Sequence, residues 1–322
     1  MIRLEHSIPD DGYAEIRATV DRLFQERPEG VGVADLADFG WTEMLDDPGT
    51  RSAAARAMFE GQGGALALAG TPETFLAATV PGYELDGAVA MLPGPDGGYL
   101  GLPGGGAEPA RLLLVDAASV RSLPADRATR AQTVDPGVSL LSVAAEATAD
   151  ATPVPGAAPG LATARVQVAL SLQLAGMCAH LLELGRDHVR TREQFGRPIG
   201  RFQAVQHLLA EVAVSVAAAD AANRNALHLI DDPESAPLAA LVAVGLGTRA
   251  FDTAARGAQQ VLGAIGYTRE HEFHRYLYRG LVLLDLLGSH DIDGRVGAAA
   301  RSTAVTPPVG TWRDRFEEGL HL

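Results

Sequence analysis

Cysteine and aromatic residues are scarce in this sequence, and each scarcity excludes a class of protein. The single cysteine, Cys178, stands in an apolar helical stretch. It allows no disulfide framework and no thiolate metal site, so we expect a small buried hydrophobe there and no metal centre. Aromatic residues make up 5% of the chain against 47% hydrophobic residues. This balance favours packed helices over an aromatic-rich sandwich.

Basic charge is also in short supply, because the formal net charge is −14. A nucleic acid partner is therefore not expected, since no basic face is available to neutralise phosphates. The deficit does not exclude small anionic ligands, which a local arginine cluster can bind inside an acidic protein.

The first residues, Met-Ile-Arg-Leu-Glu-His, show no signal-peptide pattern. No apolar run reaches about 18 residues without a polar or charged break, so we expect no membrane span and no membrane partner. These features predict a soluble, cytoplasmic protein. Its 322 residues are too many for one small core and favour two or three packed subdomains.

The first half of the chain divides into a helical region at 1–74 and a small β domain at 75–150. Helical spacing in the first region, interrupted by glycine and proline, occurs at 13–25, 33–41 and 51–60. In the second region the helical period is lost, and glycine- and proline-rich turns separate short strand-like runs. These runs lie at 88–92, 98–102 and 111–115, with weaker ones near 130–148.

The second half of the chain reads as a bundle of long helices. A proline- and glycine-rich linker at 151–160 precedes the bundle at 161–305. Helices near 30 residues exceed the usual globular length and are typical of up-and-down bundles. The expected helices span about 161–191, 200–230, 235–263, 269–288 and 291–303. A tail at 306–322 carries Trp312 and Phe316, which could dock on a neighbouring surface.

The stretch from Arg190 to His207 is the richest in chemistry. Two arginines, a glutamine, an aromatic ring and a glycine turn fall within its first seven residues. That set suits a dinucleotide, because a guanidinium binds pyrophosphate, an aromatic face stacks on adenine and glycine permits close backbone approach. From these residues alone, a polar connection between two helices with no ligand is an equally good reading.

This stretch, Thr191-Arg-Glu-Gln-Phe-Gly-Arg-Pro-Ile followed by Phe202-Gln-Ala-Val-Gln, resembles the acyl-CoA dehydrogenases. A second segment, Gln260-Val-Leu-Gly-Ala-Ile-Gly-Tyr-Thr-Arg, followed by His274-Arg-Tyr and Arg279, resembles the family in the same order. The resemblance covers about 160–290 and is faint before 150. It implies an α+β, mostly α fold with a short N-terminal helical region, a small reduced β domain and a C-terminal long-helix bundle.

The resemblance also implies an FAD site between subunits, in which one subunit holds the flavin ring and its neighbour grips the ADP end. By position, Arg192 would contact the pyrophosphate, with Gln194 as a nearby polar contact and Phe195 near the adenine. Gln203 would approach the adenosine. The residues that would line the pyrophosphate and ribose across the interface are Gln260, Gly263 and the backbone of Ala264, which replaces the family's second glycine. The alternative is that these residues only cap and connect helices.

The catalytic base expected for this family is missing. The family's reaction removes the α-proton of an acyl thioester with a glutamate while a hydride passes from Cβ to the flavin. One of the two known glutamate positions falls on Arg249, or on Thr248 or Ala250 if the alignment slips by one. The other falls on Gly288, with Asp285 one turn earlier as a weak substitute.

The threonine-glutamate-proline-x-x-glycine-serine and tryptophan-x-threonine stretches that hold the flavin ring in this family are also absent from 70–150. The chain is therefore similar to the short subunits of actinobacterial α2β2 steroid-CoA dehydrogenases. That resemblance implies a partner subunit that supplies the glutamate, the flavin-ring pocket and most of the acyl-CoA site. Two alternatives stay open: a self-sufficient acyl-CoA or acyl-carrier dehydrogenase with a divergent site, and a non-catalytic structural or regulatory homologue.

Overall fold

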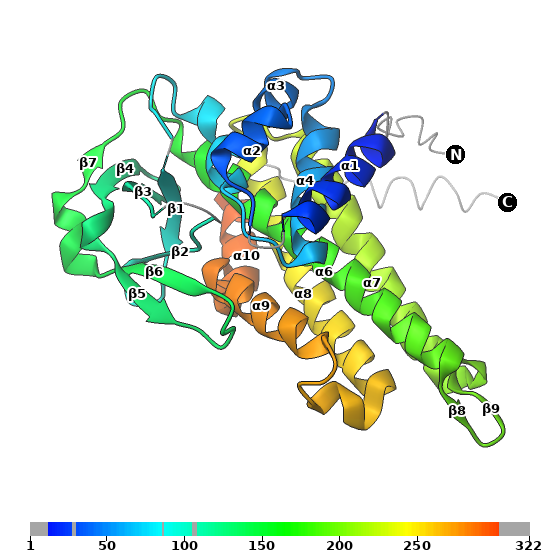
Figure 1. Cartoon of the computed structure of the whole chain (residues 1–322). Helices are drawn as coiled ribbons and strands as arrows, with labels where there is room; N and C mark the ends of the chain where they lie inside the picture. The colour runs from blue at the N-terminus through cyan, green and yellow to red at the C-terminus, as the bar shows by residue number, and fades with distance from the viewer. Residues whose placement is uncertain (1–11, 28–29, 86, 105–107, 303–322) are drawn as a thin grey trace, which may run out of the picture.

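The computed structural model describes residues 12–302 with gaps at 28–29, 86 and 105–107. A helical region, a small β-sheet domain and a bundle of long helices follow one another (Figure 1). This order confirms the expected α+β, mostly α fold class. The exact domain boundaries stay a prediction, and the expected tail at 306–322 with Trp312 and Phe316 lies outside the described residues.

The N-terminal region contains more helices than the sequence pattern indicated. The helices are α1 (Tyr13–Glu26), α2 (Val33–Asp38), α3 (Trp41–Asp46), α4 (Arg51–Ala65) and α5 (Thr71–Phe75), followed by the 3-10 helix η1 (Ala77–Thr79). The stretch 33–41, expected as one short helix, is α2 followed by the start of α3, since Gly40 takes φ +78° and turns the chain there. Helix α5 has a proline in its first turn and was too short for periodicity to indicate.

The β domain is a seven-stranded sheet with strand order β5-β6-β2-β1-β3-β4-β7. In this sheet β1 and β3 pair in parallel, while the other neighbouring strands that the structure describes pair antiparallel. The strands are β1 (Ala88–Pro93), β2 (Tyr99–Gly101), β3 (Arg111–Val115), β4 (Val120–Pro124), β5 (Thr129–Gln132), β6 (Ser139–Val143) and β7 (Thr152–Pro153). Strand β4 was not expected, and β7 lies in the stretch read as a linker.

Both faces of the central strand β1 are buried, and each face serves a different core. Ala88, Ala90 and Leu92 pack in the core shared with the helical bundle. Val89 and Met91 point the other way into a small core of the β domain itself. Because side chains alternate across a strand, β1 joins the sheet to the bundle while closing the interior of the β domain.

The C-terminal bundle follows the expected helices within a few residues, except that α9 starts later than expected. Its helices are α6 (Pro159–Thr191), α7 (Gln203–His228), α8 (Ala236–Leu262), α9 (Phe273–Leu286) and α10 (Ile292–Ser302). Helix α6 is the centre of the molecule, since it packs against α4, α7, α8 and α9. Cys178 on α6 is fully buried, and burial raises the pKa of its thiol, which confirms the expected structural role.

Three long helices are apolar enough to cross a membrane by length and composition: α6, α7, and α8 continued through Tyr267. These helices contain polar or charged residues, so the expectation that no unbroken apolar run reaches about 18 residues is not contradicted, and the absence of a membrane span stays a prediction. The most apolar 18-residue stretches of α6 and α8 are 78% and 56% buried inside the protein. Packing within the protein therefore accounts for the apolar composition of these two helices. The corresponding stretch of α7 is only 11% buried, so contacts among the described residues do not explain its apolar composition.

Helices α4 and α6 approach each other so closely that their backbones touch through glycine. A Cβ atom added to Gly63 would lie 1.9 Å from the carbonyl oxygen of Gln173, and one added to Gly176 would lie 2.0 Å from that of Glu60. Any side chain at either position would force the two helices apart. The N-terminal region is thus seated on the bundle by backbone-to-backbone contact.

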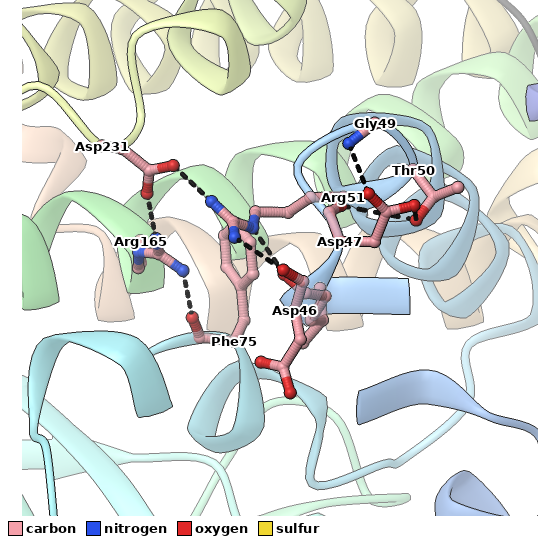
Figure 2. A network of polar contacts seen from close by, with 9 residues as sticks. Asp46, Asp47, Gly49, Thr50, Arg51, Phe75, Arg165 and Asp231 are labelled. Carbon is pink, nitrogen blue, oxygen red and sulfur yellow. Dashed lines mark hydrogen bonds and ion pairs between the residues drawn. The ribbon is translucent and has the colours of Figure 1, made fainter. Parts of the chain in front are cut away.

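A network of ion pairs around the exposed carboxylate of Asp231 reinforces the same junction (Figure 2). Asp231, in the connection between α7 and α8, accepts hydrogen bonds from Arg51 of α4 and Arg165 of α6. The Arg165 side chain is 4% exposed, and its other terminal nitrogen donates to the carbonyl oxygen of Phe75 at 2.8 Å. One carboxylate therefore joins three segments that are distant in sequence.

Glu73 on α5 ties the helical region to the sheet. Its Oε1 accepts a hydrogen bond from the backbone N–H of Ala90 at 2.9 Å, while its Oε2 has no partner among the described residues. Burial raises the pKa of this carboxyl to about 7, against the opposing effect of that backbone hydrogen bond. The group is therefore protonated in the folded protein at a pH where it is ionised in the unfolded chain.

We expect Gly176→Ala to destabilise the protein by about 1–3 kcal/mol, because the new methyl group overlaps the carbonyl oxygen of Glu60. Gly64→Ala is the matched control on α4, since its Cβ would meet nothing closer than 3.5 Å. The control should keep the parent stability or gain up to about 1 kcal/mol from better helix propensity. Urea unfolding followed by circular dichroism measures both, and equal midpoints would contradict the packing argument.

Glu73→Gln should change how stability depends on pH. A carboxyl whose pKa is raised in the folded state costs stability progressively as pH rises from about 4.5 to 7, and the full cost remains above that range. The variant lacks this cost, so its stability relative to the parent should rise on the order of 2–3 kcal/mol between pH 5 and pH 8. Exposed Glu84→Gln is the control; a Glu73→Gln difference that is the same at both pH values would refute the assignment.

Candidate functional site

A short β-hairpin with a two-residue turn connects α6 to α7 at one end of the bundle (Figure 1). Its strands β8 (Glu193–Gln194) and β9 (Arg197–Pro198) pair antiparallel. Phe195 and Gly196 form the turn with φ +54° and +76°, the signs that a type I′ turn requires. Sequence patterns did not indicate this hairpin, because a phenylalanine with positive φ is uncommon.

The turn presents an aromatic ring to the outside of the molecule. Phe195 is 91% exposed and touches the ring of Phe202 edge-to-face at 6.0 Å between centroids. The guanidinium of Arg197 covers the Phe202 ring at 4.3 Å. A large apolar ring held outward on a structured turn is a binding feature more than a packing one.

Arg192, which caps the C-terminus of α6, carries a cation available to a ligand. Its neighbours on the helix are paired, Arg186 with Glu183 and Arg190 with Asp187. No carboxylate lies within 4.0 Å of Arg192 among the described residues. Its field contributes to lowering the pKa of His188, after burial and His271. Beside it, a hollow of about 380 Å³ is lined by Arg186, Val189, Arg190, Pro198, Gly200 and Arg201, which makes this end of the bundle locally basic.

The second predicted segment lies where α8 ends and the 3-10 helix η5 (Gly263–Tyr267) begins. Gly263 has φ +61°, and a Cβ atom there would meet nothing within 4 Å. The backbone is thus open to a molecule from outside the chain. Gln260 and Ala264 are exposed, and Tyr267 is 78% exposed.

Both predicted segments project from the same end of the bundle (Figure 1). The structure places all seven predicted cofactor residues at or near the surface; Arg192, Gln194, Phe195, Gln203, Gln260 and Ala264 are exposed and Gly263 is partly so. Gln203 lies 3.4 Å from the ring nitrogen Nε2 of His207 within α7. The chain does not enclose a dinucleotide with these residues; it offers them outward. Their roles stay a prediction.

A cavity of about 680 Å³ lies between the β domain and the other end of the bundle. Leu92, Ala164, Gln167, Leu286 and Leu287 form its buried floor. Its rim carries exposed residues of the β domain and of the C-terminal part of the bundle, namely Pro93, Pro95, Ala117, Ala118, Asp285, His290, Asp291 and Ala298. The cavity therefore has an apolar floor and an acidic mouth.

The positions expected for a catalytic base relate to this cavity in different ways. Gly288 lines it in a left-handed conformation (φ +62°) and follows buried Leu287, so no carboxylate occupies this turn. Arg295 donates to the Leu287 carbonyl oxygen at 2.7 Å. Asp285 lies on the exposed rim. Arg249 is not among the lining residues, since its side chain is 66% exposed and pairs with Asp293 at 2.8 Å.

Sequence reasoning missed the polar residue on the cavity floor. Gln167 is 5% exposed, and none of the described residues supplies it with a hydrogen-bond partner. The helical spacing of Gly160, Thr163, Ala164 and Gln167 does place these residues on one face of α6, but only the fold shows that this face borders a cavity.

Solved structures of the same fold cover most of this chain. A variant of the steroid ACAD Tcur3481-Tcur3483 superposes with a TM-score of 0.71 at 20% identity, over 91% of this chain and 98% of that chain. The ChsE4-ChsE5 complex from Mycobacterium tuberculosis gives 0.66 at 20% identity, over 92% and 98%. Butyryl-CoA dehydrogenase from Megasphaera elsdenii gives 0.64 at 13% identity, over 93% and 99%. The chain therefore has the acyl-CoA dehydrogenase fold.

Sequence comparisons add to the structural ones for the helical bundle. Residues 157–300 match the family model described as "Acyl-CoA dehydrogenase, C-terminal domain", and this part of the chain belongs to the acyl-CoA dehydrogenase family. Acyl-CoA dehydrogenase FadE34 of Mycobacterium tuberculosis is 37% identical over 41% of this chain and 18% of its own length. Acyl-CoA dehydrogenase IpdE2 of the same organism is 36% identical over 49% of this chain and 46% of its own length. The alignments thus span less than half the length of these two relatives.

Proposed function

We propose that this chain is a subunit of an FAD-dependent acyl-CoA dehydrogenase that supplies the ADP-end half of an interfacial flavin site and lacks the catalytic glutamate. The separation of its two site elements carries this proposal. Gln167 on the cavity floor and Arg192 at the hairpin lie 25 residues apart along α6 and its end, which is about 38 Å along the helix axis. A flavin dinucleotide cannot reach from the cavity to the hairpin of the same chain.

The hairpin end fits the ADP part of FAD. Arg192 offers an unpaired guanidinium for pyrophosphate, Phe195 offers an exposed ring for adenine stacking, and Gly263 leaves backbone open to close approach. When bound, FAD supplies the acceptor for the hydride that leaves the acyl Cβ. The residues of this chain bind and orient its distant end; they do not contact the reacting atoms.

The cavity does not fit the reacting end. Removal of the α-proton needs a carboxylate held in a dry pocket beside the substrate. At the turn where one is expected, the chain has Leu287 and Gly288 instead. Asp285, at the exposed mouth, has a shorter side chain than glutamate and shows no buried environment. The base is accordingly assigned to a partner subunit.

Helix α7 supports a partner of the same class. Its apolar composition with an 11% buried window leaves a face rich in small apolar residues open, with Val214 70% exposed. Such a face suits a second long helix. The solved neighbour ChsE4-ChsE5 is itself a complex. We therefore propose a hetero-oligomer of the α2β2 type, located in the cytoplasm, with a CoA ester of a steroid side chain as the substrate class.

A self-sufficient dehydrogenase is the second candidate, because Asp285 does border a cavity large enough for an acyl group. Two observations weigh against a self-sufficient dehydrogenase. The carboxylate of Asp285 is exposed, and none of the described residues replaces the family's motifs that hold the flavin ring. If this candidate holds, the purified chain alone is yellow and reduces a dye when given an acyl-CoA, and Asp285→Asn abolishes that activity. A purely structural homologue would bind no flavin in any assembly.

The test is flavin content after purification of the tagged chain from its native cells. We expect a second, dehydrogenase-like polypeptide to copurify, with one FAD per two chains. Arg192→Ala should weaken FAD binding by about 10- to 100-fold, since it removes a charge-assisted contact. Arg127→Ala is the control, because exposed Arg127 is paired with Asp150 in the β domain, away from the hairpin, and should leave the flavin content unchanged.

Two results would overturn the proposal. One is a homo-oligomer of this chain that contains one FAD per chain and reacts with acyl-CoA. The other is an assembly in which Arg192→Ala has the same flavin content as the parent and as Arg127→Ala.

A further inference from the structure

Two histidines lie beside Arg192 at the hairpin end of the bundle, and the flavin proposal gives neither of them a role. His188 precedes Arg192 by one helical turn, and the backbone N–H of Arg192 donates to the carbonyl oxygen of His188 at 2.9 Å. Residues four apart along a helix share a face, so the two side chains are neighbours. The second histidine, His271, comes from the connection between η5 and α9.

The contacts between α9 and α6 place His271 near this pair. The two helices run antiparallel: Tyr276, near the start of α9, stacks on His180 at 4.2 Å between ring centroids, while Leu286, at the end of α9, borders the same cavity as the first turns of α6. A carboxylate oxygen of Glu272 lies 3.6 Å from Nε2 of His180. The chain before Glu272, which begins with His271, therefore lies toward the C-terminal end of α6.

The electrostatics of His188 agree with this placement. Burial, His271 and Arg192, in this order, hold the pKa of His188 below its usual range. The imidazole of His188 is therefore neutral at neutral pH in the chain alone. Nδ1 of His271 accepts a hydrogen bond from the backbone N–H of Phe273 at 3.1 Å. In its neutral form the His271 ring thus carries its hydrogen on Nε2, which makes that nitrogen a donor.

The surroundings of these groups offer little to neutralise a cation. Helices α7 and α8 meet this part of α6 through apolar side chains, since Leu209 and Val261 lie against Gly185. The carboxylates next to the three residues in sequence are either paired or exposed, namely Asp187 with Arg190, Glu272 with His180, and exposed Glu193 and Glu270. Arg192 and the two histidines therefore form a group that lacks a counter-ion among the described residues.

An anion bound at Arg192 reverses the electrostatic balance at His188. A pyrophosphate diester carries two negative charges, and a negative charge within about 4–6 Å favours the protonated form of a histidine. The protonated ring also donates charge-assisted hydrogen bonds to phosphate oxygens. Because the bound state then holds one proton more than the free state, binding strengthens as pH falls through the pKa that His188 has in the complex.

We propose that His188 and His271 complete the pyrophosphate site around Arg192, and that His188 takes up a proton when the pyrophosphate binds. This inference rests on the proposed function and adds to it a dependence of flavin retention on pH. His271 contributes a neutral donor, His188 a proton-linked cation and Arg192 a permanent one. The two segments that the flavin proposal names are thereby joined in one site by a residue from each of α6 and the connection to α9.

The test is the affinity for FAD of the copurified assembly after removal of its flavin, followed by flavin fluorescence at pH 6 and pH 8. The pyrophosphate of FAD carries the same charge at both pH values, so a difference arises in the protein. The parent should bind FAD about 5- to 10-fold more tightly at pH 6, since a pKa change of one unit on binding corresponds to a tenfold change in affinity. His188→Gln keeps a donor but cannot titrate, so this ratio should fall to about 1.

Two further variants complete the test. His228→Gln is the control, because His228 is exposed at the C-terminal end of α7, and it should keep the parent ratio. His271→Ala should weaken FAD binding by about 3- to 10-fold at both pH values, because it removes a donor.

The outcomes separate this inference from the proposed function. Equal affinity of the parent at both pH values, a parent ratio in His188→Gln, or parent affinity in His271→Ala overturns the inference and leaves the proposed function standing. An assembly in which Arg192→Ala binds FAD as the parent does overturns both.

Discussion

The backbone contact between α4 and α6 is the constraint on which the arrangement of the molecule depends. Gly63 and Gly176 let the two helices touch, and the shared carboxylate of Asp231 joins both to the connection between α7 and α8 (Figure 2). Because interiors are close-packed, a displacement of even one methyl group is transmitted to neighbouring elements. The position of α6 is thereby set relative to the N-terminal region, and α6 in turn positions both site elements.

The length of helix α6 keeps the cavity and the hairpin far apart. Its first turns form the floor of the cavity, and its last residue leads into the hairpin that carries Arg192 and Phe195. In a bundle of shorter helices these features would be close enough to serve one ligand. Here they are roughly 38 Å apart, so one dinucleotide cannot contact both. This geometry makes an interfacial flavin site a more natural use of the hairpin than a site within one chain.

The electrostatics of the two ends agree with this division. The hairpin end combines an unpaired guanidinium with further arginines around a small hollow, which suits an anionic ligand in an otherwise acidic protein. The cavity end combines buried leucines and a buried glutamine with carboxylates at its mouth. An anion is thus favoured at one end of α6 and disfavoured at the other.

The linear sequence was sufficient for the features that depend on local periodicity and residue type. It determined the long helices, the mostly α fold, the buried Cys178, and the lack of a glutamate at Gly288, because these follow from spacing and chemistry within short segments. Helices as short as α3 and α5, strand β4 and the hairpin turn at Phe195 escaped it, since their conformations rest on tertiary contacts or on an uncommon positive φ.

Other properties were decided only by the tertiary structure. Nothing local to Gln167 shows that its face of α6 borders a cavity, and nothing local to α7 shows how much of its apolar surface the described residues leave exposed. Likewise, Arg249 and Gly288 were both expected to mark base positions, yet only Gly288 borders the cavity. Burial and neighbourhood are set by segments far apart in the chain, so residue identity and spacing determine what a side chain can do, while packing determines what it meets.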